Sequence, residues 1–133
     1  MIERVASGDR NAPVFIKHAA HVPPPREAVR ELMPALFDLL ADEPSAAVRA
    51  VLGHFCFVFI DPYLDGNGRM GRFLMNAMLA SGGYPRTIIR VDWRDRYMAA
   101  LDAASARGDI GPFAEFVAAA VQAEAHAPPP AGA

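Results

Sequence analysis

The stretch FIDPYLDGNGRMGRFL, residues 59–74, places glycines, arginines and two carboxylates between apolar segments. Gly66-Asn67-Gly68 can adopt backbone angles that other residues avoid, so that successive N–H groups turn toward one point. A helix that begins at this glycine loop adds its own unpaired N–H groups and the positive end of its dipole. The stretch therefore predicts an anion site, and above all a site for phosphate.

Charged side chains on both sides of the glycine loop indicate which phosphate ligand to expect. Arg69 and Arg72 are three residues apart and emerge on neighbouring faces of the first helical turn, where two guanidinium groups suit a polyphosphate. Asp65 directly precedes the loop and offers the kind of oxygen ligand that Mg²⁺ takes when it bridges phosphates. Asp61 lies four residues upstream, and a second acid is unexpected beside a phosphate site.

The chain before the loop carries two apolar patterns with helical spacing. The first covers residues 29–40, and Pro34 within it is expected to kink or divide the helix. The second helix begins at Pro44 and ends before Pro62, which biases Asp61 out of the helical region. The run HFCFVFI, residues 54–60, is by itself also compatible with a buried strand, but continuous periodicity from residue 48 favours helix.

Three further helices are predicted after the loop. The third runs from the loop to about Ser81, and its almost wholly apolar composition predicts that it is the central buried helix. Asp92 is expected to cap a fourth helix, and Asp109 and Pro112 to begin a fifth. The chain is therefore predicted to be all-α, with about five or six helices around a central buried helix.

Composition limits the classes of function. The 133 residues are 53% apolar and 21% charged, which is typical of one globular domain. Cys56 is the single cysteine, so no disulfide forms within the chain, in agreement with a cytoplasmic location. A net charge of −2 argues against nucleic acid as a partner, and no apolar run is long enough to cross a membrane.

The ends of the chain are expected to differ from its middle. Residues 1–13 are polar and predicted to be flexible, residues 14–122 form the domain, and residues 123–133 form a disordered tail. VFIKHAAHV, residues 14–22, has an apolar start and predicts a short hairpin or an extended flap. Such a flap either presents an edge to a target peptide or contributes its apolar residues to the core.

The segment DPYLDGNGRMGR resembles the signature of the Fic (Fic/Doc) family, His-Pro-Phe-x-Asp/Glu-Gly-Asn-Gly-Arg-x-x-Arg. The resemblance covers about residues 14–120 and includes a segment similar to the family's target-docking β-hairpin flap, with Val14, Phe15, Ile16 and Lys17. It implies a Fic fold and the transfer of AMP from ATP to a Ser, Thr or Tyr hydroxyl of a target protein. Some members transfer other phosphate-bearing groups, and some remove AMP.

The resemblance also implies roles for single residues. Asp65 matches the residue that binds Mg²⁺, Gly66-Asn67-Gly68 the residues that cradle the α- and β-phosphates, and Arg69 and Arg72 those that support the phosphate chain. Asp61 stands where the family has its catalytic histidine. That histidine accepts the proton of the target hydroxyl as its oxygen attacks the α-phosphorus.

Asp61 is therefore expected to impair transfer. A carboxylate with a pKa near 3.9 is a weaker base than an imidazole with a pKa near 6.5, and it brings negative charge beside the attacked phosphorus. Loss of base catalysis costs about 10²–10⁴-fold in rate. Protein kinases use an aspartate as the base, so catalysis by Asp61 stays an alternative, as does a non-catalytic nucleotide-binding or interaction module.

Other histidines and a missing motif complete the expectations. His54 lies about 10.5 Å along a helix from Asp61, too far to replace the base, and is expected to be a packed or capping residue. A metal pair of His18 and His21 with the two acids is disfavoured, because a flap is a poor platform for ligands. The sequence lacks the family's inhibitory pattern Ser/Thr-x-x-x-Glu-Gly/Asn, which implies a separate regulatory partner or an inhibitory helix outside a fragment.

Overall fold

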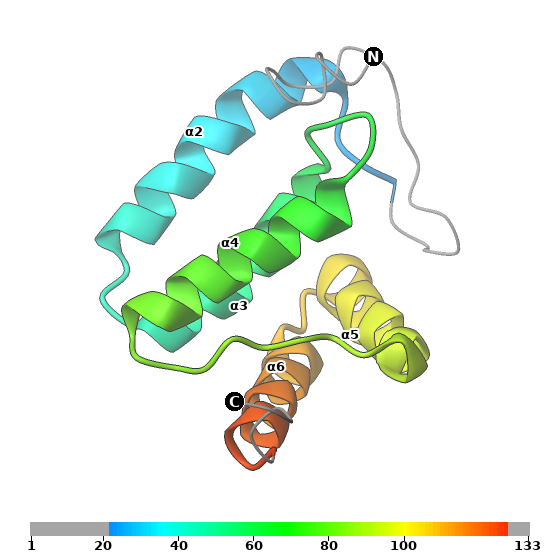
Figure 1. Ribbon diagram of the computed structural model, residues 1–133. Coiled ribbons are helices and arrows are strands. Elements are labelled where there is room, and N and C mark those ends of the chain that lie inside the picture. Colours follow the sequence, from blue (N-terminus) through cyan, green and yellow to red (C-terminus); the bar gives the residue numbers. More distant parts are fainter. Residues whose placement is uncertain (1–21, 128–133) are drawn as a thin grey trace.

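The computed structural model describes residues 22–127, and all regular structure in that range is helical (Figure 1). The elements are α2 (Arg26–Asp42), α3 (Ala46–Ile60), α4 (Asn67–Ser81), the 3₁₀ helix η1 (Val91–Trp93), α5 (Arg94–Arg107) and α6 (Gly111–Ala125). The predicted all-α class is confirmed. The expected flap, with residues 14–17, lies outside the described residues.

Helix α2 continues through Pro34, so of the two predicted effects of this proline, a kink or a division, the division is wrong. Pro34 is exposed on the outer side, while the buried face of α2 carries Val29, Met33, Leu36 and Leu40. This face packs against α3, and the burial of four large side chains outweighs the hydrogen bond that a proline removes.

The central helix is α3 and not α4, which corrects the expectation for residues 68–81. Helix α3 contacts α2, α4 and α6, and in Figure 1 it lies behind α4 and beside α2. Helix α4 buries Gly71, Met75 and Leu79 but leaves the side chain of Phe73 70% exposed. Its apolar composition therefore includes an outer face that the described residues do not cover.

Helices α3 and α4 approach each other closely because α4 has a glycine at the contact. A Cβ atom on Gly71 would lie 3.0 Å from the Cγ2 atom of Val58. Ser45 caps the start of α3, since its hydroxyl oxygen accepts a hydrogen bond from the Val48 N–H at 3.2 Å. The helix therefore begins at Ala46, two residues after the predicted start at Pro44.

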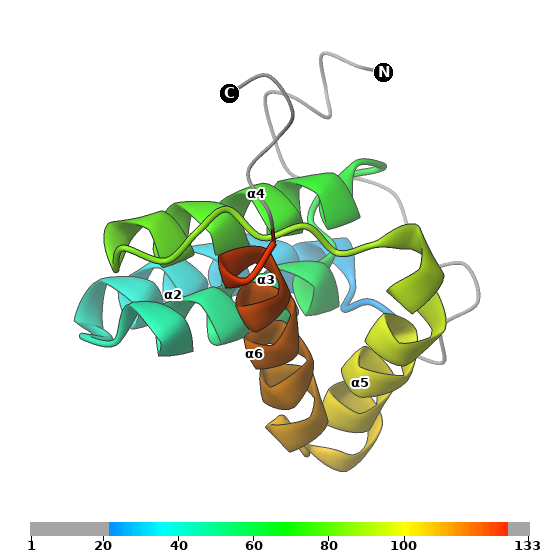
Figure 2. The ribbon, with the colours of Figure 1, turned by 60° about the horizontal axis from the view of Figure 1, so that its bottom comes forward.

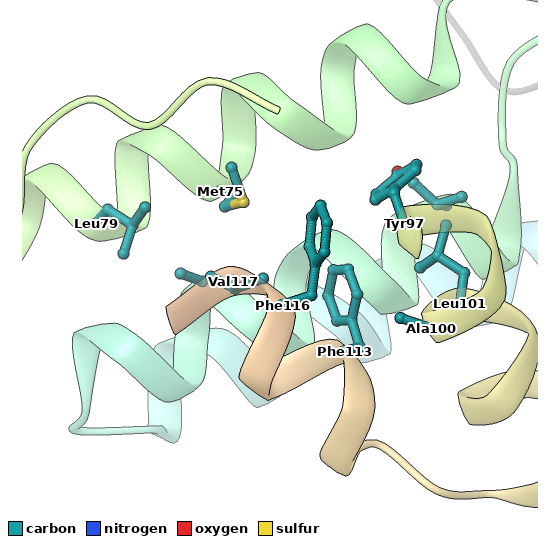
Figure 3. Close-up of a cluster of buried hydrophobic side chains, with 10 residues drawn as sticks. Met75, Leu79, Tyr97, Ala100, Leu101, Phe113, Phe116 and Val117 are labelled. Carbon is teal, nitrogen blue, oxygen red and sulfur yellow. The ribbon is translucent and has the colours of Figure 1, made fainter. Parts of the chain in front are cut away.

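Two hydrophobic clusters hold the helices together. One lies between α2 and α3, and the other is shared by α3, α4, α5 and α6. Figure 3 shows part of the second cluster, in which Phe113 and Phe116 of α6 lie between α4 and α5, near Tyr97. The helices on both sides of the glycine loop, α3 and α4, therefore share the second cluster, and α3 also belongs to the first.

Helix α5 starts differently from the prediction. Asp92 lies within η1 and pairs with Arg90 at 3.1 Å, and α5 begins after Trp93 without a side-chain cap. Asp109 accepts a hydrogen bond from the Gly111 N–H at 3.1 Å at the start of α6. Helix α6 runs to Ala125, so the helical domain extends past the expected end at residue 122.

The link between α4 and η1 has no regular secondary structure, and Figure 2 shows it running back along α4. The side chain of Asn76 in α4 holds the link in place, because it accepts a hydrogen bond from the Thr87 N–H at 2.7 Å and donates one to the Thr87 carbonyl at 3.0 Å. Among residues 22–127, no helix is long and apolar enough to cross a membrane.

Candidate active site

The turn between α3 and α4 begins at Asp61, which ends α3 in the left-handed conformation with φ 53° and ψ 56°. Its backbone N–H donates to the Phe57 carbonyl at 2.9 Å, and the residue is only 5% exposed. Aspartate is among the few non-glycine residues that tolerate this conformation. Pro62 follows and is fully buried, so the helix ends where the sequence predicts.

The side chain of Asn67 closes the turn. Its Oδ1 atom accepts from the Tyr63 N–H at 2.9 Å, and its Nδ2 atom donates to the Tyr63 carbonyl at 2.8 Å. Tyr63 in turn packs its ring against Phe57, with ring centroids 6.1 Å apart. Asn67 was predicted as a phosphate-cradling residue, and the structure shows that its amide side chain shapes the loop, which leaves its backbone N–H for a ligand.

The first turn of α4 is open. Gly66 precedes it in the left-handed conformation with φ 75° and gives no side-chain cap, and the first N–H bonded within the helix is that of Met70, to the Gly66 carbonyl. An α-helix leaves the N–H groups of its first residues without an intrahelical acceptor, here those of residues 67–69. These donors and the helix dipole have the chemistry that suits an anion, and they lie in the loop for which the sequence predicts a phosphate site.

Two arginines flank this helix end. Arg69 and Arg72 are both exposed, and a Cβ atom on Gly68 would lie 3.3 Å from a terminal nitrogen of Arg72. The Arg72 guanidinium group therefore folds back over the first turn, close to the open N–H groups. Asp65 is exposed just before the loop, so the structure brings together the predicted loop, both arginines and this carboxylate.

The donor set fits a Mg²⁺ ion that is held mainly by a ligand's phosphates. Within residues 22–127 no group of three His, Cys, Asp or Glu side chains could hold a metal ion. Mg²⁺ in nucleotide sites is commonly bound through one or two carboxylates together with phosphate oxygens and water. The exposed carboxylate of Asp65 beside the anion site suits that arrangement.

A hollow of about 590 Å³ adjoins the arginines. Helix α4 supplies one wall with Arg69, Arg72 and Phe73, and the link between α4 and η1 supplies the other with Arg86 and Ile88. Three arginines at its margin make it electropositive, and the exposed Phe73 and Ile88 give it an apolar surface. Because Asn76 is bonded to Thr87, the link is held against α4 at this place.

Below the loop the structure reveals a buried pair that no local pattern in the sequence indicates. His54 of α3 is fully buried, as a packed histidine was expected to be, and its Nε2 atom lies 2.6 Å from the Tyr97 hydroxyl. Burial lowers the pKa of His54 to about 4, with the Gly71 backbone opposing and the charge of Arg72 adding to the effect. Burial also raises the pKa of Tyr97 to about 12. The pair is therefore neutral at pH 7.

Comparison with known proteins identifies the fold that carries this site. Residues 2–79 match the Fic/DOC family. The chain belongs to this family. It is 42% identical over 113 residues to the protein adenylyltransferase Fic of Nematostella vectensis, covering 82% of this chain and 26% of the relative.

Solved structures agree with the family assignment. Fic-1 of C. elegans, residues 134–508, superposes with a TM-score of 0.76 at 32% identity, over 88% of this chain and 34% of that chain. A Fic family protein from Desulfovibrio desulfuricans G20 gives a TM-score of 0.75, also at 32% identity, over 86% of this chain and 38% of that chain. The Fic fold is therefore confirmed, and the chain spans about a quarter of the length of the curated relative from Nematostella vectensis.

Proposed function

We propose that this domain transfers AMP from Mg-ATP to a hydroxyl group of a target protein, at a rate that Asp61 reduces. The observation that carries the proposal is the open first turn of α4, with Gly66 in the left-handed conformation and Arg72 folded over it. An anion site of this kind suits the phosphates of a nucleotide. The adenylyltransferase names of the relatives support AMP as the transferred group.

The proposed reaction is a displacement at the α-phosphorus. The target oxygen forms a bond to phosphorus, the bond to the bridging oxygen of the β-phosphate breaks, and pyrophosphate leaves. Negative charge that builds on the phosphoryl oxygens is stabilised by the N–H groups of the first turn and by Arg69 and Arg72. Asp65 would hold Mg²⁺, which neutralises phosphate charge when it is bound.

Asp61 occupies the position of the residue that would accept the proton of the target hydroxyl. A carboxylate with an ordinary pKa near 3.9 accepts a proton less readily than an imidazole does, and its charge opposes the approach of the phosphates. The backbone at this position is left-handed, a conformation that histidine tolerates as well as aspartate. A histidine at residue 61 therefore fits the turn and would supply the missing base.

Target and regulatory partners complete the proposal. The target protein would dock on the flap at residues 14–17, by adding a strand to its edge. A regulatory partner, or a helix from a longer chain, would control access to the arginines.

Two measurements test the proposal with the chain and its Asp61→His variant. Calorimetry with Mg-ATP tests the loop, and both proteins are expected to bind. Intact-mass detection of an added AMP group, on the chain itself or on a candidate target, tests the base. Transfer by the variant at least 10²-fold faster than by the chain supports the proposal. Equal rates contradict the role given to residue 61, and a failure to bind Mg-ATP contradicts the phosphate site.

The second candidate is a non-catalytic nucleotide-binding module, favoured by the buried carboxylate at residue 61. Such a module binds Mg-ATP but transfers no AMP with either residue at this position. The same pair of proteins therefore separates the two functions.

A further inference from the structure

The imidazole ring of His54 connects four helices below the phosphate loop. It belongs to α3, stacks on Phe113 of α6 with ring centroids 5.4 Å apart and planes at 22°, and meets the Tyr97 ring of α5 edge to face at 5.6 Å. Its Nε2 atom shares a hydrogen bond of 2.6 Å with the Tyr97 hydroxyl. The fourth contact is with α4, through the opposite ring nitrogen.

That nitrogen, Nδ1, is buried and has no partner of hydrogen-bonding geometry among the residues that the structure describes. It faces Gly71 in the first turns of α4, where an added Cβ atom would lie 3.4 Å from it. Gly71 thus leaves room for the ring edge to lie against the backbone of α4. A buried polar atom without a partner is costly, so the contact with Gly71 calls for an explanation.

The two neutral tautomers of His54 differ in what they offer to α4. If Nε2 carries the proton, it donates to the Tyr97 oxygen, and a bare lone pair of Nδ1 faces Gly71. If Nδ1 carries it, the Tyr97 hydroxyl donates to Nε2, and an N–H faces the backbone of α4. A helical carbonyl oxygen has a second lone pair for such a donor.

The position of the ring against the Gly71 backbone distinguishes the two tautomers. The Gly71 backbone raises the pKa of His54, although burial dominates and lowers it. An acceptor near a ring nitrogen favours the protonated ring and raises its pKa, whereas a donor would lower it. The helix agrees with this: Gly71 lies inside α4, where its N–H is used by the helix, while its carbonyl keeps a second lone pair for a donor.

We propose that His54 is a positioning residue for the phosphate site: Tyr97 fixes its tautomer with the proton on Nδ1, and this N–H holds the first turns of α4 in place. Arg72 follows Gly71 directly, so the contact that places Gly71 also places the arginine. The positive charge of Arg72 lowers the pKa of both His54 and Tyr97. A neutral ring avoids repulsion with this arginine.

The effect on a ligand rests on the proposed function, whereas the tautomer and the contact with α4 do not. The first experiment is therefore independent of nucleotide. Imidazole ¹H–¹⁵N spectra of the ¹⁵N-labelled chain at pH 7 are expected to show His54 with its proton on Nδ1. A proton on Nε2 would overturn the proposal.

The Tyr97→Phe variant removes the hydroxyl and keeps the ring. We expect the tautomer of His54 to become mixed and the backbone amide signals of Gly71 and Arg72 to move. Tyr84→Phe is the matched control, because Tyr84 is partly exposed beyond the far end of α4. Unchanged signals in Tyr97→Phe, or equal changes in the control, would contradict the proposal.

Two substitutions of His54 separate its nitrogens. Asparagine places an amide near the position of Nδ1, whereas glutamine reaches toward the position of Nε2. In Mg-ATP calorimetry of the full chain, we expect His54→Asn to bind within about threefold of the unchanged chain and His54→Gln to bind about tenfold more weakly. Circular dichroism checks that each variant is folded. If one of them is not, the Mg-ATP affinity of Tyr97→Phe is measured in its place.

The outcomes keep the two proposals apart. Equal affinities of the Asn and Gln variants, or the reverse order, overturn the positioning role while leaving the phosphate site intact. A chain that binds no Mg-ATP overturns the proposed function, and the tautomer and amide signals then decide the role of His54 by themselves.

Discussion

The two ends of α4 satisfy their backbone groups in opposite ways. At the C-terminal end the N–H groups of residues 82–84 donate to the carbonyls of Leu79 and Ala80, and the Ser81 hydroxyl donates to the Met78 carbonyl at 2.6 Å. At the N-terminal end Gly66 gives no side-chain cap and the first N–H groups stay open. The backbone groups of α4 are paired at its C-terminal end and open at its N-terminal end, where we propose that a nucleotide binds.

Arginines show the same contrast. At the closed end Arg49 donates to the Glu43 carbonyl at 2.7 Å and to the Ser81 hydroxyl at 2.9 Å, so its charge serves the fold. At the open end Arg72 lies over Gly68 at the margin of the electropositive hollow. Substitutions at the open end should therefore change ligand binding or turnover, and those at the closed end should change stability.

The largest effect is expected at the turn before the open end. Asp61→His should raise the rate of AMP transfer by about 10²–10⁴-fold, because it supplies a base with a pKa near working pH. Intact-mass spectrometry over time measures the rate. Asp61→Asn is the control, since it keeps the size of the side chain and tolerates the left-handed conformation but provides no base. A gain in Asp61→Asn equal to that of Asp61→His would show that removal of charge, and not the base, limits transfer.

The buried histidine below the open end should make stability depend on pH. His54 has a pKa of about 4 in the folded protein and about 6.5 when unfolded, so the unfolded chain binds more protons between these values. The free energy of unfolding should therefore rise by about 3 kcal/mol from pH 4 to pH 6.5 through this residue.

Urea unfolding at a series of pH values, in the chain and in His54→Gln, measures this contribution. Carboxylates titrate in the same range in both proteins, so the difference between the two curves isolates His54. Parallel curves would mean that His54 is not held neutral by burial.

Arg72→Ala should weaken Mg-ATP binding by about 10- to 100-fold, since hydrogen bonds to charged groups contribute about 1.5–3 kcal/mol. The free energy of unfolding should change little, because the side chain is exposed. Arg49→Ala is its counterpart at the closed end and should lower stability by about 1 kcal/mol with unchanged binding. Calorimetry and urea unfolding of both variants test the contrast, which fails if both lose the same property.

Local patterns in the sequence were sufficient to predict the helices and the position of the glycine loop. Proline and glycine mark the ends of α3 and α4, and the loop chemistry depends on neighbouring residues such as Gly66 and Arg69. The central helix was predicted wrongly because composition counts apolar residues without showing which faces are covered, as the exposed Phe73 illustrates. A contact between residues that are far apart in the sequence leaves no local pattern. The pair of His54 and Tyr97 could not be predicted for this reason, because the two residues are 43 positions apart.

A pair of glycine substitutions gives the smallest and most selective test of the two ends. Gly82→Ala at the closed end would bring a Cβ atom into Ala46 of α3, so we expect a loss of about 1–3 kcal/mol in the free energy of unfolding. Gly68→Ala at the open end would meet only the terminal nitrogen of Arg72, at 3.3 Å, which can move aside. Stability should then stay within about 0.5 kcal/mol, while the displaced guanidinium group weakens Mg-ATP binding. One variant adds a methyl group in the first turn of α4 and the other adds one at the residue that caps its C-terminal end, so thermal unfolding and calorimetry compare the two ends directly. Weaker binding in Gly82→Ala without loss of stability would refute the division between a structural end and a ligand-binding end.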